Sequence, residues 1–300
     1  MYPMAPLIRT ALNTTARLAP GTAGHWAFRL FVRPLGRAKA RPAEAALLAA
    51  ARTGVLHVHG KDVVTYAWGD GRRPVLLVHG WSSRASRLGA FAEELLARGY
   101  SPVAFDCPGH GDSPGRATNI VEYREIIRRL HARHGDFEAV VAHSFGVLAS
   151  LFALRDGVRT ARFVGIGGVG SFAMLTEGFR AGLGLDDRVV RAMRGHVERR
   201  LVPGEPGVWD RFGADHAPEE LGAPVLLFHD EDDDMVPPAH ARFLARAHGD
   251  RARLVVTRGL GHRRILTDPG VVAEAVAFVT AGSVPEPAVT VRGGVSPAAS

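Results

Sequence analysis

Short apolar runs alternate with longer amphipathic runs between about residues 55 and 281. This alternation is typical of a mostly parallel β-sheet with helices on both faces, because each connection between parallel strands needs a crossover long enough for a helix. The fold class is therefore predicted to be α/β. The expected strands span residues 55–58, 63–68, 74–79, 102–106, 138–142, 162–166, 224–228 and 253–257, and the expected helices span 88–98, 119–133, 145–154, a stretch after residue 238, and 268–280.

A segment of about residues 170–222 separates two of the expected strands and is too long for a simple crossover. It contains two helical patterns, at residues 172–181 and 186–201. Because an insertion at this position lies above the carboxyl edge of the sheet, we expect a short helical lid. The apolar side chains of the lid either cover a hydrophobic substrate or pack the lid onto the core.

Two regions flank the predicted domain of residues 55–281. Residues 1–54 are expected to form a basic, helical extension, and residues 282–300, rich in Pro, Gly, Ser and Ala, a disordered tail. Residues 1–43 hold seven basic residues and no acidic one, which accounts for the net charge of +7. Since the folded domain then offers no basic stripe, nucleic-acid binding is not expected. An amphipathic helix around residues 25–32 would either lie on an anionic membrane surface or pack against the domain.

Cys107 is the single cysteine of the chain, which excludes an intramolecular disulfide and a cysteine-based metal cluster. A lone cysteine also fits a reducing compartment. No apolar run approaches the ~20 residues that span a bilayer, and the N-terminus lacks an apolar stretch followed by a small-residue cleavage site. We therefore expect a cytoplasmic protein whose membrane contact, through residues 1–43, is at most peripheral. No oligomeric state follows from the sequence.

The pentapeptide at residues 142–146 is the first candidate for chemistry, with Ser144 at its centre. It directly follows an expected buried strand and opens an expected helix. A serine nucleophile needs such a sharp turn, and small residues two before and two after it allow the turn to close. Gly146 fits this pattern, whereas Ala142 adds one methyl group where glycine is usual. The pentapeptide alone also suits an ordinary turn, so its position between strand and helix carries the prediction.

A serine hydroxyl needs a base within hydrogen-bond reach and a third group that orients the base. His262 follows the last expected strand, and Gly261 leaves room for the chain to turn there. The acid should follow the strand before it, where residues 229–237 offer several carboxylates. Asp233 is preferred from its spacing to the start of the next helix, and Asp232 is the alternative.

Two backbone N–H groups are needed to hold the oxyanion of a tetrahedral intermediate. One is expected from Phe145, the residue after the nucleophile. The other is expected from Trp81 in the loop after the strand of residues 74–79, where Gly80 lets the chain turn. The Trp81 ring either forms a wall of the acyl pocket or packs against the strand ends.

The order Ser144, Asp233, His262, together with Val-His-Gly-Trp ending at Trp81 and Phe-Asp-Cys-Pro-Gly-His-Gly-Asp-Ser at residues 105–113, resembles the α/β-hydrolase superfamily. The resemblance covers about residues 60–281. It implies the α/β-hydrolase fold and serine-based acyl chemistry, with no metal or organic cofactor. A serine in the turn disfavours the members with an aspartate nucleophile, such as dehalogenases and epoxide hydrolases. The sequence departs from the family pattern at Ala142 and at Asp230, where a glycine often precedes the acid.

The expected function is that of a serine esterase, which cleaves a carboxylic ester or a similar small-molecule acyl substrate through an acyl-enzyme, and the apolar lid leaves open whether that substrate is hydrophobic. The same three residues also suit acyl transfer, thioester or peptide hydrolysis, carbon–carbon bond cleavage, or cofactor-free peroxidase chemistry. A non-catalytic binding protein on the same scaffold is the alternative outside enzymes.

Several residues beside the expected site have a structural interpretation as well as a functional one. We expect Asp106 to shape the turn after its strand, and His79 and His143 to orient loops or pack. Arg263 and Arg264 follow the expected base directly. They either meet an anionic group of the substrate or face solvent and pair with nearby carboxylates.

Overall fold

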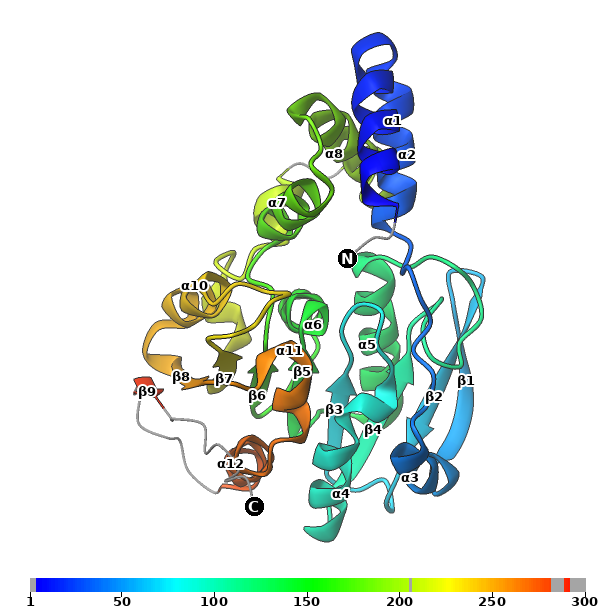
Figure 1. The fold of residues 1–300 in the computed structure, drawn as a ribbon. Helices are drawn as coiled ribbons and strands as arrows, with labels where there is room; N and C mark the ends of the chain where they lie inside the picture. Colours follow the sequence, from blue (N-terminus) through cyan, green and yellow to red (C-terminus); the bar gives the residue numbers. More distant parts are fainter. Residues whose placement is uncertain (1–3, 205–206, 282–288, 292–300) are drawn as a thin grey trace, which may run out of the picture.

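A computed structural model describes residues 4–204, 207–281 and 289–291 of the 300-residue chain. Its centre is a β-sheet in which the described residues form nine strands in the order β1-β2-β4-β3-β5-β6-β7-β8-β9 (Figure 1). Strands β1 and β2 form an antiparallel hairpin, and β2 is antiparallel to β4. All pairs from β4 to β9 are parallel. The strands are β1 (Arg52–Val58), β2 (Lys61–Ala67), β3 (Pro74–Val78), β4 (Ser101–Asp106), β5 (Ala139–His143), β6 (Phe163–Ile166), β7 (Val225–Asp230), β8 (Ala252–Thr257) and β9 (Val289–Val291).

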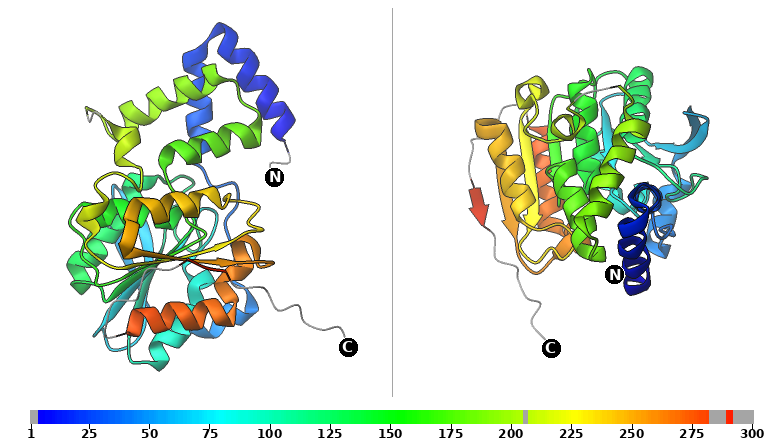
Figure 2. Two further views of the ribbon diagram at one scale, coloured as in Figure 1. Left: turned by 90° about the vertical axis from the view of Figure 1, so that its left-hand side faces the viewer. Right: turned by 90° about the horizontal axis from the view of Figure 1, so that it is seen from above.

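Helices cover both faces of this sheet, which confirms the predicted fold class (Figure 2). Helices α5 (Ile120–His134), α6 (Phe145–Arg155) and α10 (Ala239–His248) pack on one face, and α4 (Gly89–Ala97) and α12 (Pro269–Thr280) on the other. The short helix α3 (Ala45–Ala49) precedes β1. Successive residues of β3 alternate between the two cores: Leu76 packs with α5 and α6, and Leu77 with α4 and α12. Burial of both faces explains why the strand is apolar throughout.

Four helices stand above the carboxyl edge of the sheet and form what we call the cap (Figures 1 and 2). Two come from the expected insertion, α7 (Phe172–Leu183) and α8 (Asp187–Leu201), and two from the N-terminal segment, α1 (Ala5–Leu18) and α2 (Pro20–Phe31). A further short helix, α9 (Val208–Arg211), follows α8 before the chain returns to β7. The N-terminal helices are thus joined in space to a segment that lies far away in sequence.

The contact between α2 and α8 is close enough to require glycine. A Cβ atom on Gly24 would lie 2.5 Å from the Cβ of Ala192. At the other end of the cap, Asn13 donates to the carbonyl oxygen of Gly184 (3.0 Å) and accepts from the N–H of Asp186 (2.9 Å). The apolar face of α2 therefore packs on α8, and Phe28 is buried there. None of the described helices is both long and apolar enough to cross a membrane.

The structure bears on two expected boundaries, the end of the N-terminal extension and the start of the tail. Strand β1 begins at Arg52, inside the stretch assigned to the N-terminal extension. The tail that is expected to be disordered spans residues 282–300. Residues 282–288 and 292–300 lie outside the residues that the structure describes. Val289–Val291 form β9, which pairs with β8.

The carboxyl ends of β3, β5, β7 and β8 meet at one edge of the sheet, beneath the cap. The residues that follow these four strands are those predicted for the site: Trp81, Ser144, Asp233 and His262. Parallel strands thus bring together side chains that lie far apart in the sequence.

Candidate active site

Ser144 occupies the turn between β5 and α6 in a strained backbone conformation, with φ 56° and ψ −123°. The turn closes because two glycines leave space beside it. A Cβ atom on Gly80 would lie 2.6 Å from the Cβ of Ser144, and one on Gly146 would lie 2.7 Å from the carbonyl oxygens of Val78 and His79. Ala142, the departure at the first position, is fully buried in β5 and leaves this turn intact.

A continuous chain of hydrogen bonds joins Ser144, His262 and Asp233. The Ser144 Oγ lies 3.0 Å from His262 Nε2, and His262 Nδ1 lies 2.7 Å from Asp233 Oδ2. The other carboxylate oxygen of Asp233 accepts from the N–H groups of Met235 (2.9 Å) and Val236 (2.8 Å). Burial alone would raise the pKa of Asp233, but these hydrogen bonds and His262 outweigh it, so the pKa is lowered. Asp233 is therefore held as a carboxylate facing the imidazole.

Asp232, the alternative acid, points elsewhere. It is exposed, and its Oδ2 accepts from the N–H of Gly259 at 2.9 Å. Asp232 therefore ties together the loops after β7 and β8. The structure brings Asp233, and not Asp232, to His262.

Asp230 is a residue of the site that the sequence marks only as a departure from the family pattern. It is fully buried at the end of β7. Its carboxylate accepts from the Thr257 hydroxyl (2.7 Å) and from the N–H groups of Leu260 (3.1 Å) and Gly261 (2.9 Å). Burial tends to raise its pKa, but these donors lower it overall. Asp230 thereby positions the loop that carries His262, and its place at the end of a strand does not by itself reveal this role, because its partners lie on the loop after the next strand.

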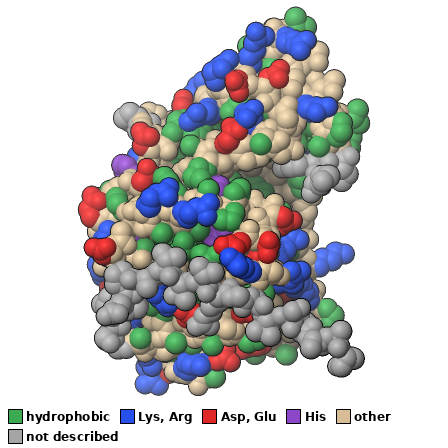
Figure 3. All heavy atoms as spheres, turned by 60° about the vertical axis from the view of Figure 1, so that its left-hand side comes forward, with side chains coloured by type: hydrophobic (Ala, Val, Ile, Leu, Met, Phe, Trp, Pro, Cys, Tyr) green, Lys and Arg blue, Asp and Glu red, His purple; other side chains and the backbone are tan. Residues whose placement is uncertain are grey.

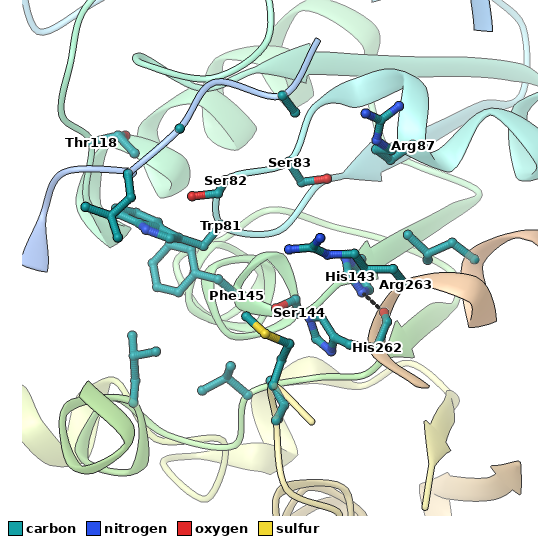
Figure 4. Close-up of a pocket in the computed structure, with 18 of the residues that line it drawn as sticks. Trp81, Ser82, Ser83, Arg87, Thr118, His143, Ser144, Phe145, His262 and Arg263 are labelled. Atoms are coloured by element: carbon teal, nitrogen blue, oxygen red, sulfur yellow. Dashed lines mark hydrogen bonds between the residues drawn. The ribbon is translucent and has the colours of Figure 1, made fainter. Parts of the chain in front are cut away.

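His143 supports the same histidine from the other side. Its Nε2 donates to the carbonyl oxygen of His262 at 2.9 Å, and the two rings lie 4.6 Å apart (Figure 4). Burial, and then the neighbouring His262, lower the pKa of His143 to about 3, so its ring is neutral at physiological pH. A neutral ring adds no positive charge beside His262, which fits the expected role in orienting a loop.

The two predicted oxyanion donors, Phe145 and Trp81, flank Ser144. Phe145 is the first residue of α6, so its N–H has no partner within the helix. Trp81 follows Gly80, which contacts Ser144, and the Trp81 ring packs edge-on to that of Phe145 at 5.5 Å. His79 holds this loop: its Nδ1 donates to the carbonyl oxygen of Gly80 (2.7 Å) and its Nε2 accepts from the N–H of Cys107 (3.0 Å).

The residues of the turn after β4 have a structural role. Asp106 is fully buried and accepts from the N–H groups of Ala85 (2.7 Å) and Asp112 (2.8 Å). Gly111 packs against it so closely that a Cβ there would lie 1.9 Å from Asp106 Oδ2. Cys107 is buried, and burial raises the pKa of its thiol, which leaves it unreactive. These residues shape the loops around the site.

A cavity of about 850 Å³ opens above Ser144, between the body of the molecule and the cap. Its cap side is apolar and includes Phe31 of the N-terminal segment. Its other side carries Ser82, Ser83, Arg87 and Arg263 (Figure 4). Ser86 also lines the cavity. Within the described part of the chain, no cluster of His, Cys, Asp and Glu has the arrangement of a metal site. The cavity thus has the size and the two-sided lining of a pocket for a small amphiphilic molecule.

Comparisons with known proteins identify the family and the fold of this chain. The family model described as "Alpha/beta hydrolase family" matches residues 75–275. A non-heme haloperoxidase of Rhodococcus erythropolis is 26% identical, and the match covers 73% of this chain and 96% of that protein. Among solved structures, a monoacylglycerol lipase of Paleococcus ferrophilus is 26% identical with a TM-score of 0.54, covering 72% of this chain and 96% of the lipase. An esterase of Pyrococcus furiosus, 17% identical, has the same fold with a TM-score of 0.60 over 83% of this chain and 95% of the esterase.

Proposed function

This chain belongs to the alpha/beta hydrolase family and is a hydrolase, and on that premise we propose that it is a serine esterase with the triad Ser144, His262 and Asp233. The observation that carries the proposal is the unbroken hydrogen-bond chain from the Ser144 hydroxyl through His262 to the buried Asp233 carboxylate. Each member follows a different strand of the sheet, so the three meet only in the folded protein.

The proposed reaction proceeds through an acyl-enzyme. His262 Nε2 takes the proton of the Ser144 hydroxyl as Oγ attacks the ester carbonyl carbon, and Asp233 stabilises the imidazolium that forms. The N–H groups of Trp81 and Phe145 hold the oxyanion. His262 then gives its proton to the departing alcohol oxygen as the carbon–oxygen bond breaks. A water molecule repeats the sequence and releases the acid.

The proposed substrate is a small ester with an apolar acyl chain. The cap side of the cavity supports this proposal, since the rings of Phe31, Phe172 and Phe179 pack edge-to-face there at 5.2 to 5.5 Å. Two proteins similar to this chain are named a monoacylglycerol lipase and an esterase.

A second candidate, peroxidase chemistry on the same triad, is favoured by one observation: the Rhodococcus relative is named a non-heme haloperoxidase. In that reaction hydrogen peroxide would replace water in attacking the acyl-enzyme, giving a peracid and free Ser144. The two candidates share the first half-reaction. Product analysis with and without added peroxide shows whether water or hydrogen peroxide attacks the acyl-enzyme in the second half-reaction.

We expect a fluorophosphonate probe to form one covalent adduct, located on Ser144 by mass spectrometry of peptides. The reason is that the probe reacts with serine hydroxyls activated by an adjacent base. Ser144→Ala should remain unlabelled, and prior incubation with a p-nitrophenyl ester should compete with labelling. Folded protein that neither reacts with the probe nor hydrolyses p-nitrophenyl esters of graded chain length would contradict the proposal and favour a binding protein.

We also propose peripheral contact with anionic lipid through the outer face of α1. Met4, Leu7 and Leu18 are 59%, 65% and 89% exposed, and their spacing places them on one side of the helix. The surrounding sequence carries basic residues and no acid up to residue 43, and Figure 3 shows Lys and Arg side chains gathered on the cap. Apolar side chains among arginines suit an anionic membrane surface.

Replacement of Leu7 and Leu18 by asparagine is expected to reduce binding to phosphatidylglycerol vesicles about tenfold, measured by co-sedimentation, because two apolar side chains no longer enter the interface. Val55→Asn is the matched control, since Val55 is an exposed apolar residue on the distant strand β1. Point variants suit this test better than truncation because residues 31–47 help to line the cavity. Equal binding by all three proteins would refute the contact.

A further inference from the structure

Arg263 is the residue after the proposed base, in the short helix α11 (Gly261–Arg264), and it lines the cavity. Figure 4 shows its side chain extending into the cavity on the side of His143 and His262, above Ser144. Arg264, its neighbour in sequence, does not line the cavity and donates to the carbonyl oxygen of Gly259. Of the two arginines, Arg263 alone faces the reacting groups.

The guanidinium of Arg263 has no hydrogen-bond or ion-pair partner among the residues that the structure describes. Two other arginines of the cavity are engaged within the protein. Arg37 donates to backbone carbonyl oxygens, including that of Ser113 at 2.5 Å, and Arg87 pairs with Glu44. Besides Glu44, the cavity is lined by one other carboxylate of the described residues, that of Glu93 on α4. Arg263 therefore offers free donors to whatever occupies the cavity.

We propose that Arg263 binds an anionic group, a carboxylate or a phosphate, on the leaving-group side of the substrate. This inference rests on the proposed esterase function. In that reaction the leaving alcohol oxygen must lie beside His262 Nε2 in order to receive its proton, and Arg263 directly follows His262. The planar guanidinium fork matches the oxygens of a carboxylate or phosphate.

The two sides of the cavity then select the two ends of one molecule. The apolar acyl chain lies toward the cap, and the anionic alcohol lies toward Arg263, with Ser83 drawn above it in the same cavity (Figure 4). Hydrolysis breaks the acyl carbon–oxygen bond and adds one water molecule. The products are an apolar carboxylic acid and an alcohol that keeps its negative charge.

Two octanoate esters test this selection, one of 4-hydroxybenzoate and one of 4-hydroxybenzamide, which share an acyl chain and a shape and differ in charge. We expect wild-type protein to prefer the anionic ester. Arg263→Gln should lower kcat/KM for the anionic ester roughly 10- to 100-fold, the usual loss for a charged hydrogen bond, and for the neutral ester by less than about threefold. Arg263→Lys should retain part of the preference, because it keeps the charge without the fork.

Arg258→Gln is the matched control. Arg258 lies between β8 and α11, outside the cavity, and pairs with the exposed Glu231 at 2.7 Å, so its loss changes the net charge by the same amount. Equal effects of Arg263→Gln on both esters, or effects of Arg258→Gln as large as those of Arg263→Gln, would overturn the proposal.

Binding to Ser144→Ala protein separates this inference from the proposed function. Calorimetry should show tighter binding of the anionic ester than of the neutral one, and Arg263→Gln should abolish the difference. Should the wild type hydrolyse neither ester while this preference persists, the esterase proposal fails and the anion site stands. Should Ser144→Ala bind both esters equally, the anion site fails whatever the turnover.

Discussion

Asp233→Asn is expected to lower kcat for ester hydrolysis by about 10⁴-fold, whereas Asp232→Asn is expected to leave it within about threefold. An amide at position 233 cannot stabilise the imidazolium and does not hold His262 in the tautomer whose Nε2 accepts the serine proton. At the exposed position 232 the amide oxygen can still accept from the Gly259 N–H, and the side chain does not reach His262. The measurement is kcat for a p-nitrophenyl ester, compared with wild type.

The two variants control for each other, because they make the same chemical change at adjacent positions of one loop. Circular dichroism and a thermal unfolding curve should show that both remain folded, since the amide oxygen that Asp233→Asn introduces can still accept from the N–H groups of Met235 and Val236. A large loss in Asp232→Asn with near-normal activity in Asp233→Asn would reverse the assignment of the acid.

The sequence predicts the α/β sheet and the order of the candidate triad for a physical reason. Buried parallel strands are apolar on both faces, so each run is recognisable by itself, and their carboxyl ends meet at one edge. Once the strands are located, the residues that follow them must converge. Ser144 and His262 could be proposed in this way without knowledge of any contact between them.

The choice of acid and the role of Asp230 depend on contacts that strand patterns do not contain. The loop of residues 229–237 offers several carboxylates, and the backbone of the turn decides which one faces His262. Asp233 faces inward because its other oxygen accepts from Met235 and Val236, an Asx-type turn. Asp230 has its partners on the loop after the next strand, so no local pattern reveals its function.

In the N-terminal segment, too, the sequence predicts the helices but not the contacts that they make. The sequence predicts a helical extension with an amphipathic helix around residues 25–32, and the structure has the helices α1 and α2 there. An amphipathic helix reveals that it has an apolar face but not what covers that face. In this chain α8 covers the face of α2, and the close approach at Gly24 is apparent only once Ala192 is placed opposite.

The free energy of unfolding is expected to fall by roughly 10 kcal/mol between pH 7.5 and pH 5. Five of the buried histidines have pKa values lowered to about 3 or 4, and burial is the largest cause of each lowered pKa. In the unfolded chain each takes up a proton below about pH 6.5, whereas in the folded protein each stays neutral to a much lower pH. The folded pKa is about 4 for His79, about 3 for His110, about 3 for His143, about 4 for His240 and about 4 for His248.

The direction of this pH dependence follows from the number of protons that each state binds. Because the unfolded state binds more protons in this window, stability is full above about pH 6.5 and decreases as the pH falls toward 4. Each histidine contributes about 1.4 kcal/mol per pH unit, or about 2 kcal/mol by pH 5. Five such groups remove most of the roughly 5–15 kcal/mol that typically stabilises a folded protein. Urea unfolding curves at pH 7.5, 6.5, 5.5 and 5 measure this dependence.

His248→Leu isolates one of these groups away from the site. His248 is buried near the end of α10, and neither ring nitrogen has a hydrogen-bond partner among the described residues. An apolar side chain of similar size removes the proton that the unfolded state would gain and leaves no polar group unsatisfied. Between pH 6 and 4.5, the free energy of unfolding of the variant should therefore fall less steeply than that of the wild type, by about 1.4 kcal/mol per pH unit. The kcat at neutral pH should not change. Identical slopes for the two proteins would show that burial of His248 does not depress its pKa, and would contradict the contribution assigned to this histidine.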